Sequence, residues 1–357
     1  SDVHVHSNAF EGPNTSVCSQ RSSCMGEEDC KALLGPCDPT APGWNNQPVG
    51  AFSRLKADDG DSSCDFVQPP MGWNSYDSQV GLTNGNGGQG EAVALESAQF
   101  VAKNLAHLGY EYVVLDAGWF GDNGGSSMTV DAHGRLMPNT TLHPSSANGK
   151  GFGPLSEKVR ALGLKFGFWI MGGIPRKAVG QTPPLRIEGS NYTVDEAADL
   201  TNKRNCGWQP GFVYGTRTIS NGSALHPAAV AYYDSVARLY KQWDVAFVKM
   251  DCVFGSDYSR GSLDLEQFSA SMHTAGQPFL FSLSPGSSVS MAPKAQAFAL
   301  SRSEAGGPNL PPTMARMTGD FWDSWGSAKG HFATAANAST FVSKSFFPDL
   351  DMLPLGW

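Results

Sequence analysis

Residues 245–251 form the run Val245-Ala246-Phe247-Val248-Lys249-Met250-Asp251, an apolar segment that ends in a lysine and an aspartate. A helical pattern over residues 228–243, with Pro227 at its first turn, precedes this run. Alternation along a strand places Lys249 and Asp251 on one face. An inward charged pair in an apolar strand is costly unless it is partnered or functional, so we expect a site there. The alternative is a structural ion pair.

The same order of helix, glycine, apolar strand and polar residue occurs four times in the chain. Helical spacing over residues 90–109, 154–162 and 264–275 is followed by apolar runs over 112–116, 165–171 and 278–284. Such alternation predicts a parallel sheet, either doubly wound or closed as a (β/α)8 TIM barrel. The sequence contains no Gly-x-Gly-x-x-Gly after the first strand and no Walker loop, which disfavours a nucleotide-binding fold. The barrel is favoured further because barrel enzymes keep their chemistry at carboxyl-terminal strand ends.

Length and composition limit the possible classes. A chain of 357 residues allows two to three domains, or one barrel with an extension. Hydrophobic residues make up 40% of the chain, enough for a sizeable core. The net charge of −8 argues against nucleic acid as the main partner. We expect no membrane span, because no apolar run reaches the length of a transmembrane helix, and the scattered histidines show no metal-ligand spacing.

Residues 1–68 are rich in Cys, Pro, Asp and Ser and lack the periodic pattern of residues 69–357. We expect them to form an irregular, Cys-rich N-terminal extension. They contain five of the seven cysteines, namely Cys18, Cys24, Cys30, Cys37 and Cys64. The clustering favours disulfides in an oxidising compartment over a zinc site, because no Cys-x-x-Cys pair is present. A first residue other than Met suggests a removed leader. Five Asn-x-Ser/Thr sequons also indicate a secreted or secretory-lumen glycoprotein, at Asn14, Asn139, Asn191, Asn221 and Asn337.

Six blocks in chain order resemble glycoside hydrolase family 27, the α-galactosidase and α-N-acetylgalactosaminidase family. The blocks are Pro70-Met71-Gly72-Trp73-Asn74-Ser75-Tyr76, Asp116-Ala117-Gly118-Trp119, Gly163-Leu164-Lys165-Phe166-Gly167, Val248-Lys249-Met250-Asp251-Cys252, Arg316 to Asp320, and Pro348-Asp349-Leu350-Asp351-Met352-Leu353. The resemblance covers residues 69–357. It implies a (β/α)8 barrel followed by an antiparallel β-sandwich.

The resemblance also implies roles for individual residues. Asp251 matches the nucleophile and Asp320 the general acid/base of a retaining, double-displacement mechanism. Lys249 would keep Asp251 ionised and donate to a sugar hydroxyl. The other expected sugar-binding residues are Trp73, Asp116, Trp169, Ser284, Arg316 and Asp351. Cys206 and Cys252 match a disulfide of the family, and neither a metal nor an organic cofactor is implied. Asp320 has a second interpretation as the N-cap of a helix opened by Phe321-Trp322.

Three departures from the family pattern affect the expected substrate and the expected architecture. Ala117 stands where the family has a second Asp, which favours a sugar without C6 such as β-L-arabinopyranose. Ser284 stands where α-galactosidases have a Glu that contacts the 2-hydroxyl, as in the N-acetylgalactosaminidases. The chain ends at Trp357, after the seventh strand. We expect a C-terminal continuation or a second chain to supply the eighth strand and the sandwich, because an open barrel exposes sheet edges.

The sequence therefore predicts a secreted retaining exo-glycosidase that hydrolyses terminal α-D-galactoside-type linkages of a carbohydrate substrate. The alternative is a weak or inactive glycosidase-like glycoprotein with a glycan-binding or structural role in an extracellular assembly, reached through the N-terminal Cys-rich segment. Ala117 and the altered loop after residue 284 favour the alternative. Because Asp251 and Asp320 are both present, the enzyme is the preferred interpretation.

Overall fold

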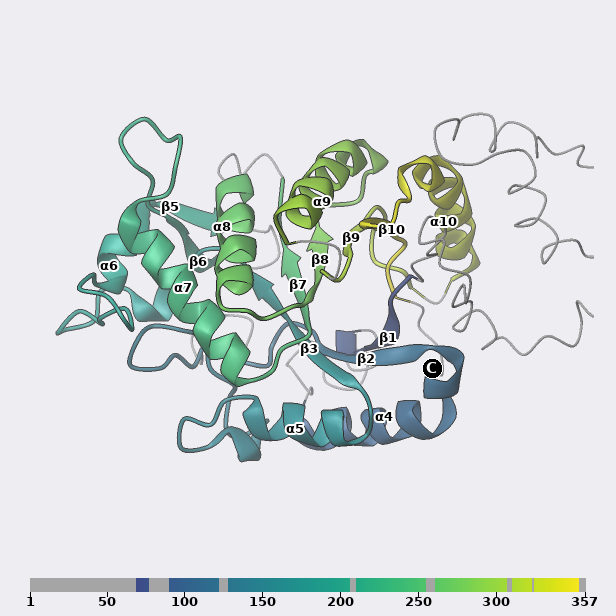
Figure 1. Cartoon of the computed structure of the whole chain (residues 1–357), viewed down its shortest axis with the longest axis horizontal. Helices are drawn as coiled ribbons and strands as arrows, with labels where there is room; N and C mark the ends of the chain where they lie inside the picture. The colour runs from purple at the N-terminus through teal and green to yellow at the C-terminus, as the bar shows by residue number, and fades with distance from the viewer. Residues whose placement is uncertain are drawn as a thin grey trace, which may run out of the picture. The chain divides into compact units, whose positions relative to one another are not determined.

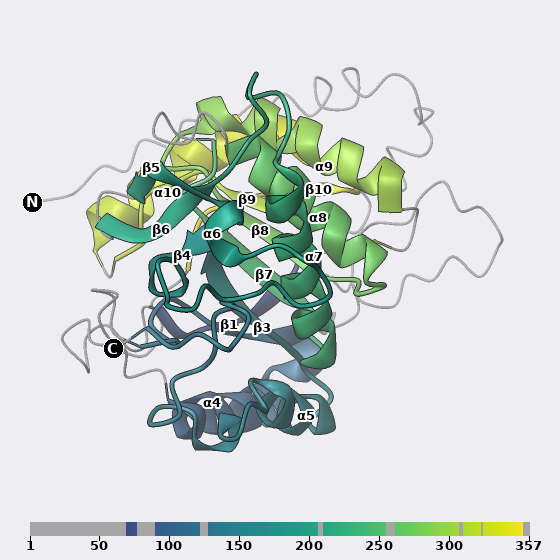
Figure 2. The ribbon, with the colours of Figure 1, turned by 90° about the vertical axis from the view of Figure 1, so that its left-hand side faces the viewer.

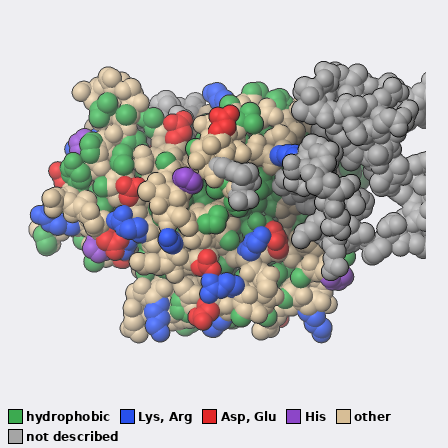
Figure 3. Space-filling view, in the orientation of Figure 1, with side chains coloured by type: hydrophobic (Ala, Val, Ile, Leu, Met, Phe, Trp, Pro, Cys, Tyr) green, Lys and Arg blue, Asp and Glu red, His purple; other side chains and the backbone are tan. Residues whose placement is uncertain are grey.

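The computed structural model describes residues 69–76, 90–121, 128–205, 210–254, 261–306, 310–322 and 324–352. The expected Cys-rich extension, with Asn14 and its five cysteines, lies outside these residues, as does Cys206. No helix among the described segments is long and apolar enough to cross a membrane. On the face shown in Figure 3, acidic and basic side chains are interspersed, with no single large basic area.

The described residues contain one seven-stranded sheet in which every neighbouring pair is parallel. Its strands follow the chain order: β1 (Met71–Asn74), β2 (Tyr110–Leu115), β3 (Lys165–Met171), β7 (Phe247–Asp251), β8 (Leu280–Ser284), β9 (Thr313–Arg316) and β10 (Phe346–Asp349). The sheet curls like the wall of a barrel (Figure 1). The prediction of a (β/α)8 barrel represented by its first seven strands is confirmed.

One α-helix of at least nine residues lies between each pair of consecutive strands of this sheet. These helices are α4 (Glu91–Asn104), α5 (Gly153–Ala161), α7 (Pro227–Gln242), α8 (Gly261–Thr274), α9 (Ala292–Gly306) and α10 (Trp325–Ala338). They line the outer side of the sheet, with α4 and α5 next to β2 and β3, and with α7 packed on α8 (Figure 2). Because all seven strands are parallel, their carboxyl-terminal ends lie at one edge of the sheet.

Several predicted boundaries agree closely with the structure. Strand β3 covers residues 165–171 as expected, and Pro227 occupies the first turn of α7. The helix expected over 90–109 is divided: α4 ends at Asn104, and a 3-10 turn over Ala106–Leu108 follows. Gly109 then adopts φ 98°, a left-handed conformation that glycine accepts without strain and that ends the helical segment before β2.

A second, antiparallel sheet between β3 and α7 was not predicted. It contains β4 (Ile174–Pro175), β6 (Pro210–Thr216) and β5 (Ala198–Asn205), in that order. A one-turn helix, α6 (Val194–Ala197), precedes β5 and starts with a capping box between Thr193 and Glu196. The sequence gives little sign of these strands, because β4 is two residues long and β5 carries mostly polar residues instead of an alternating apolar pattern. The insertion lies beside the carboxyl-terminal end of β3.

The core between sheet and helices is aromatic. Trp119, Phe152, Phe168 and Trp243 are fully or almost fully buried, and the ring of Phe152 lies 5.1 Å from Trp119 and 5.5 Å from Trp243, centroid to centroid. Burial of each such side chain contributes about 1.5–3 kcal/mol. Replacement of Phe152 by Ala would open a cavity at the centre of this cluster and cost about 3–5 kcal/mol.

Candidate active site

The charged residues expected from the sequence lie at the carboxyl-terminal ends of different strands. Asp116 follows β2, Asp251 ends β7, Arg316 ends β9, and Asp351 lies two residues beyond β10. Because the strands are parallel, these residues occupy the same edge of the sheet. Trp73 lies in β1, half-buried against the core. The fold therefore collects side chains that are as much as 235 residues apart between Asp116 and Asp351.

Lys249 and Asp116 form a buried ion pair. The Lys249 Nζ lies 2.8 Å from Oδ2 of Asp116, which also accepts a hydrogen bond of 3.0 Å from the Asn74 amide. Burial opposes the charge on Lys249, but attraction to Asp116 and Asp251 outweighs it and raises the lysine pKa. Lys249 is therefore a fixed, permanently charged donor at the edge of the sheet.

The carboxylate of Asp251 is held by two donors. The indole Nε1 of Trp169 donates to Oδ2 over 3.2 Å, and the amide of Cys252 donates to Oδ1 over 2.8 Å. Burial raises the pKa of Asp251, and the positive charges of Lys249 and Arg316 oppose that rise. Trp169 is completely buried. In the structure the Trp169 indole orients the Asp251 carboxylate, and its expected contact with a sugar stays a prediction.

Arg316 links two further carboxylates. Its Nη1 is hydrogen-bonded to Oδ1 of Asp320 and lies 3.7 Å from Oδ1 of Asp351. Burial disfavours the charged form of Arg316, yet Asp351, Asp251 and Asp320 together raise its pKa. Asp251 and Asp320 are thus both within the electrostatic reach of one guanidinium. This arrangement joins the Arg316–Asp320 pair to the Lys249–Asp251 strand in a single charged site.

The alternative interpretation of Asp320 as a helix N-cap is wrong. Helix α10 begins at Trp325, and the Ser324 side chain caps it by accepting from the Ser327 amide. Sequence reasoning placed the helix start too early because Phe321 and Trp322 are compatible with a first turn. The carboxylate of Asp320 is therefore available for the site rather than bound to helix amides.

The loop after β10 is anchored to the loop after β9. Asp351 Oδ2 accepts from the Phe321 amide over 2.7 Å, and the Asp351 amide donates to Oδ1 of Asp349 over 3.0 Å. Asp351 adopts φ 72° and Cys252 adopts φ 58°, uncommon for residues other than glycine. Such conformations cluster at functional sites, where the surroundings hold them in place.

Ser284 and Ala117 lie at the positions that depart from the family pattern. Ser284 pairs with Asp251 in the parallel register of β7 and β8. Its Oγ is buried and has no hydrogen-bond partner among the residues that the structure describes. Ala117 is buried, and its amide donates to Oδ1 of Asp116 over 2.8 Å. Ser284 therefore places a buried hydroxyl on the strand next to the expected nucleophile.

The remaining predicted residues are placed only in part. Cys252 is disulfide-bonded, while its expected partner Cys206 lies outside the described residues. The side chains of Asn191, Asn221 and Asn337 are exposed, and Asn139 is half-buried. These positions permit glycosylation at the three exposed sequons. In the part of the chain that the structure describes, no three His, Cys, Asp or Glu residues gather as metal ligands.

Sequence reasoning missed three residues of the site. Asn74 and Tyr76 belong to the first quoted block, yet only Trp73 was assigned a role there. Asn74 binds Asp116, and the Tyr76 ring centroid lies 5.8 Å from the Lys249 Nζ. Asp349 accepts from the Asp351 amide, and burial followed by repulsion from Asp351 raises its pKa to about 6. All three residues lie inside blocks that resemble the family, and this was the sequence signal that could have identified them as site residues.

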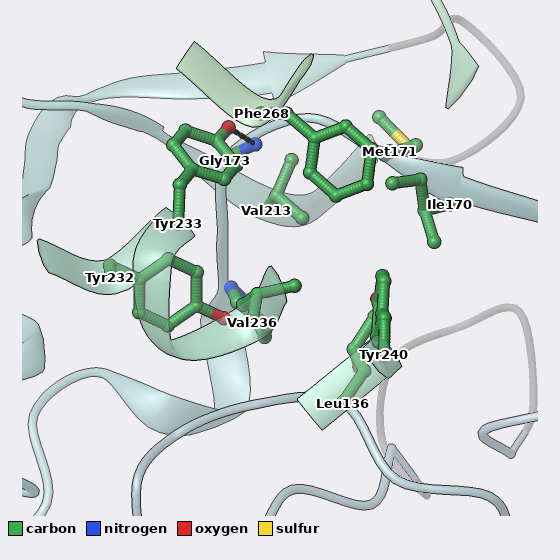
Figure 4. Close-up of a pocket in the computed structure, with 11 residues that line it drawn as sticks. Leu136, Ile170, Met171, Gly173, Val213, Tyr232, Tyr233, Val236, Tyr240 and Phe268 are labelled. Atoms are coloured by element: carbon green, nitrogen blue, oxygen red, sulfur yellow. Dashed lines mark hydrogen bonds between the residues drawn. The ribbon is translucent and has the colours of Figure 1, made fainter. Parts of the chain in front are cut away.

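A small cavity lies apart from these charges. It is lined by Ile170, Met171, Tyr233, Tyr240 and Phe268, among others, from β3, α7 and α8 (Figure 4). Its volume is about 20 Å³, enough for one water molecule but not for a sugar. The Tyr233 hydroxyl accepts from the Gly173 amide at 2.9 Å and donates to Asp264. The cavity is therefore a packing feature.

Comparison with known proteins shows the family. A β-L-arabinopyranosidase of family 27 from Geobacillus stearothermophilus, solved with arabinose, is 34% identical with a TM-score of 0.66, covering 81% of this chain and 62% of that chain. The structure of a putative α-N-acetylgalactosaminidase from Bacillus halodurans C-125 is 31% identical with a TM-score of 0.62, covering 81% of this chain and 61% of that one. No protein-family model matches the chain.

Curated relatives agree with these structures. A probable α-galactosidase B from Talaromyces emersonii is 31% identical over 184 residues, which are 46% of this chain and 36% of that protein. The chain thus spans about a third of the length of this relative. The order of the blocks, the parallel barrel strands and these likenesses together show that the chain belongs to glycoside hydrolase family 27.

Proposed function

We propose that this chain forms the catalytic barrel of a retaining exo-glycosidase that hydrolyses terminal α-D-galactoside-type linkages. The observation that carries the proposal is the pair of held carboxylates: Asp320 is hydrogen-bonded to Arg316, and Asp251 accepts from the Trp169 indole and the Cys252 amide. The names of the relatives, which include α-galactosidase and β-L-arabinopyranosidase, support the same class of substrate. We further propose that the protein is secreted and glycosylated, and that a C-terminal continuation or second chain completes the barrel.

In the first step, an oxygen of Asp251 attacks the anomeric carbon as the bond from that carbon to the leaving oxygen breaks. Asp320, in its acid form, gives its proton to the leaving oxygen. The product is a glycosyl ester of Asp251 and a free aglycone alcohol. In the second step Asp320, now ionised, takes a proton from water, and the hydroxyl adds to the anomeric carbon and releases Asp251.

The contacts around Asp251 suit a nucleophile. The Trp169 indole and the Cys252 amide each hold one carboxylate oxygen and thereby orient the group. Lys249 and Arg316 oppose the effect of burial and favour the ionised form. Lys249, Asp116, Arg316 and Asp351 also supply donors and acceptors for the ring hydroxyls of the sugar.

A preference for β-L-arabinopyranosides within this class rests on Ala117. Its methyl group replaces a carboxylate that the family directs towards the 4- and 6-hydroxyls of galactose. Loss of one hydrogen bond to a charged group costs about 1.5–3 kcal/mol, and a sugar without C6 does not need that bond. Ser284 Oγ, buried without a partner beside Asp251, supplies a polar contact on the other side of the site.

The test is hydrolysis of aryl α-D-galactopyranoside, β-L-arabinopyranoside and α-N-acetylgalactosaminide by the full-length protein. We expect turnover of at least one, and Asp251→Asn should lower it on the order of 10⁴-fold. Asp320→Asn should lower it about 10²–10⁴-fold for poor leaving groups, and less for a 2,4-dinitrophenyl group that needs no proton. Glycan binding without turnover would support the alternative, a glycosidase-like protein with a binding or structural role.

A further inference from the structure

Trp322 is a partly exposed aromatic residue in the loop that carries Asp320. About 41% of Trp322 is accessible to solvent. Its ring centroid lies 6.3 Å from that of Tyr76, with the ring planes tilted by 48°. Tyr76 in turn lies 5.8 Å from the Lys249 Nζ. Tyr76 therefore lies between the indole and the Lys249 ammonium, although Trp322 follows β9 and Tyr76 follows β1.

The main chain on both sides of this indole is anchored. The Trp322 amide donates to Ser327 Oγ over 3.3 Å, and the Ser324 amide donates to the Trp322 carbonyl over 2.6 Å. The preceding amide, that of Phe321, is bound by Asp351. These contacts fix the main chain at Trp322 to the first turn of α10 and to the residues after β10, so the backbone that carries the indole is anchored before any ligand arrives.

We propose that Trp322 and Tyr76 form an aromatic platform that binds the aglycone, the group attached to the leaving oxygen. The proposal rests on the proposed glycosidase function, in which Asp320 protonates that oxygen. The aglycone must therefore lie on the Asp320 side of the scissile bond, and Trp322 is two residues along the same loop. The chemical class of ligand is an aryl group or a pyranose ring.

The chemistry of the platform fits this class. The face of an aromatic ring is electronegative and attracts C–H edges, such as those on the apolar face of a pyranose, or the edge of another ring. Lys249 and Asp116, which the proposed function assigns to the sugar hydroxyls, are buried, whereas Trp322 at the outer end of the platform is partly exposed to solvent. The terminal sugar would thus be recognised through charge, and the aglycone through contact with a flat apolar surface.

The test measures binding by calorimetry in the full-length protein carrying Asp251→Asn, which retains the site but does not complete turnover. The ligands are the p-nitrophenyl and methyl forms of α-D-galactopyranoside and of β-L-arabinopyranoside. We expect Trp322→Ala to weaken binding of the p-nitrophenyl form about five- to tenfold and to leave the methyl form unchanged. Trp322→Phe should restore most of the difference, because it keeps an aromatic face.

Trp325→Ala is the matched control, because Trp325 is 75% exposed at the start of α10. It should change neither affinity. With the active enzyme, Trp322→Ala should lower kcat/KM for the aryl glycoside but not for the glycosyl fluoride, which has no aglycone ring. Equal losses for both forms, or no binding of either, would overturn the platform. Aryl-selective binding that depends on Trp322, together with no turnover by the protein that retains Asp251, would support the platform and refute the proposed hydrolase.

Discussion

The ammonium of Lys249 on β7 lies 2.8 Å from the carboxylate of Asp116, although β3 separates β7 from β2 in the sheet. The long lysine side chain spans this strand at its carboxyl-terminal end. The contact ties together two of the blocks that define the family, and it keeps Lys249 within electrostatic range of both Asp116 and Asp251. The pair is 11% exposed at Lys249 and 3% at Asp116, so solvent screens it weakly.

Removal of Lys249 should therefore destabilise the barrel. We expect Lys249→Met to lower the free energy of unfolding by about 3–5 kcal/mol, because Asp116 is left as a buried charge. Urea unfolding of Lys249→Met, Asp116→Asn and the double variant forms a thermodynamic cycle. The double variant should be more stable than the sum of the single effects predicts. Strictly additive effects would show that the two side chains do not stabilise each other.

Trp169→Phe should alter the pH dependence of activity. The hydrogen bond from Nε1 lowers the pKa of Asp251, so its loss raises that pKa further. The acidic limb of kcat/KM should then move to higher pH, and the maximal rate should fall about tenfold or more. Trp243→Phe, in the same aromatic core but without a contact to Asp251, is the control. A shift of equal size in both variants would assign the effect to general loosening of the core.

His143 should destabilise the fold in acid. Burial lowers its pKa to about 4, while the nearby Glu91 carboxylate acts in the opposite direction. The unfolded chain binds the proton near pH 6.5 and the folded protein only near pH 4, so stability is lost as the pH falls between these values. Neither ring nitrogen has a hydrogen-bond partner in the structure.

His143→Leu should therefore remove this acid sensitivity. Relative to the wild type, the variant should gain about 3 kcal/mol of stability between pH 7 and pH 4, measured by urea unfolding across that range. His133→Leu, which changes a histidine near the surface, serves as the comparison. If the unfolding free energies of His143→Leu and the wild type changed in parallel with pH, the imidazole would have the same pKa in the folded and unfolded protein, contrary to this prediction.

Asp349 should affect the pH dependence of stability in the opposite direction to His143. Its pKa is raised to about 6 by burial, then by the Asp351 charge. The folded protein therefore holds a proton that the unfolded chain releases near pH 3.8, and stability is lost as the pH rises through 6. Asp349→Asn keeps an oxygen for the Asp351 amide and carries no charge. It should gain on the order of 2–3 kcal/mol relative to the wild type between pH 4 and pH 7.

Gly167 should tolerate no side chain. A Cβ at this position would lie 2.4 Å from both the Cβ and the carbonyl oxygen of Phe247 on the neighbouring strand. We expect Gly167→Ala to lower the free energy of unfolding by about 1–3 kcal/mol or more. Gly330→Ala, in the middle of α10 with nothing within 4 Å, should instead stabilise the protein by roughly 0.5–1 kcal/mol. Similar melting temperatures for both variants would contradict the close strand approach.

The sequence by itself determined the parallel barrel, and it named the candidate residues that the strands carry to one edge of the sheet. The spacing of apolar residues along the sequence differs between helices and buried strands. For this reason β3, β7 and α7 were predicted within two residues of their observed bounds. The carboxylates could be named because strand ends are visible in a sequence. The order of the motifs along the chain then matched Asp251, Asp320 and Arg316 to positions of glycoside hydrolase family 27.

Only the tertiary structure decided which of these residues touch. The contact between Lys249 and Asp116 depends on sheet curvature and strand order, and Trp169 proved to be a buried donor to Asp251. The antiparallel insertion and the start of α10 were missed because short strands and helix caps are set by side-chain contacts outside the local window. Pairwise distances between residues remote in sequence result from packing of the whole chain, and no local pattern encodes them.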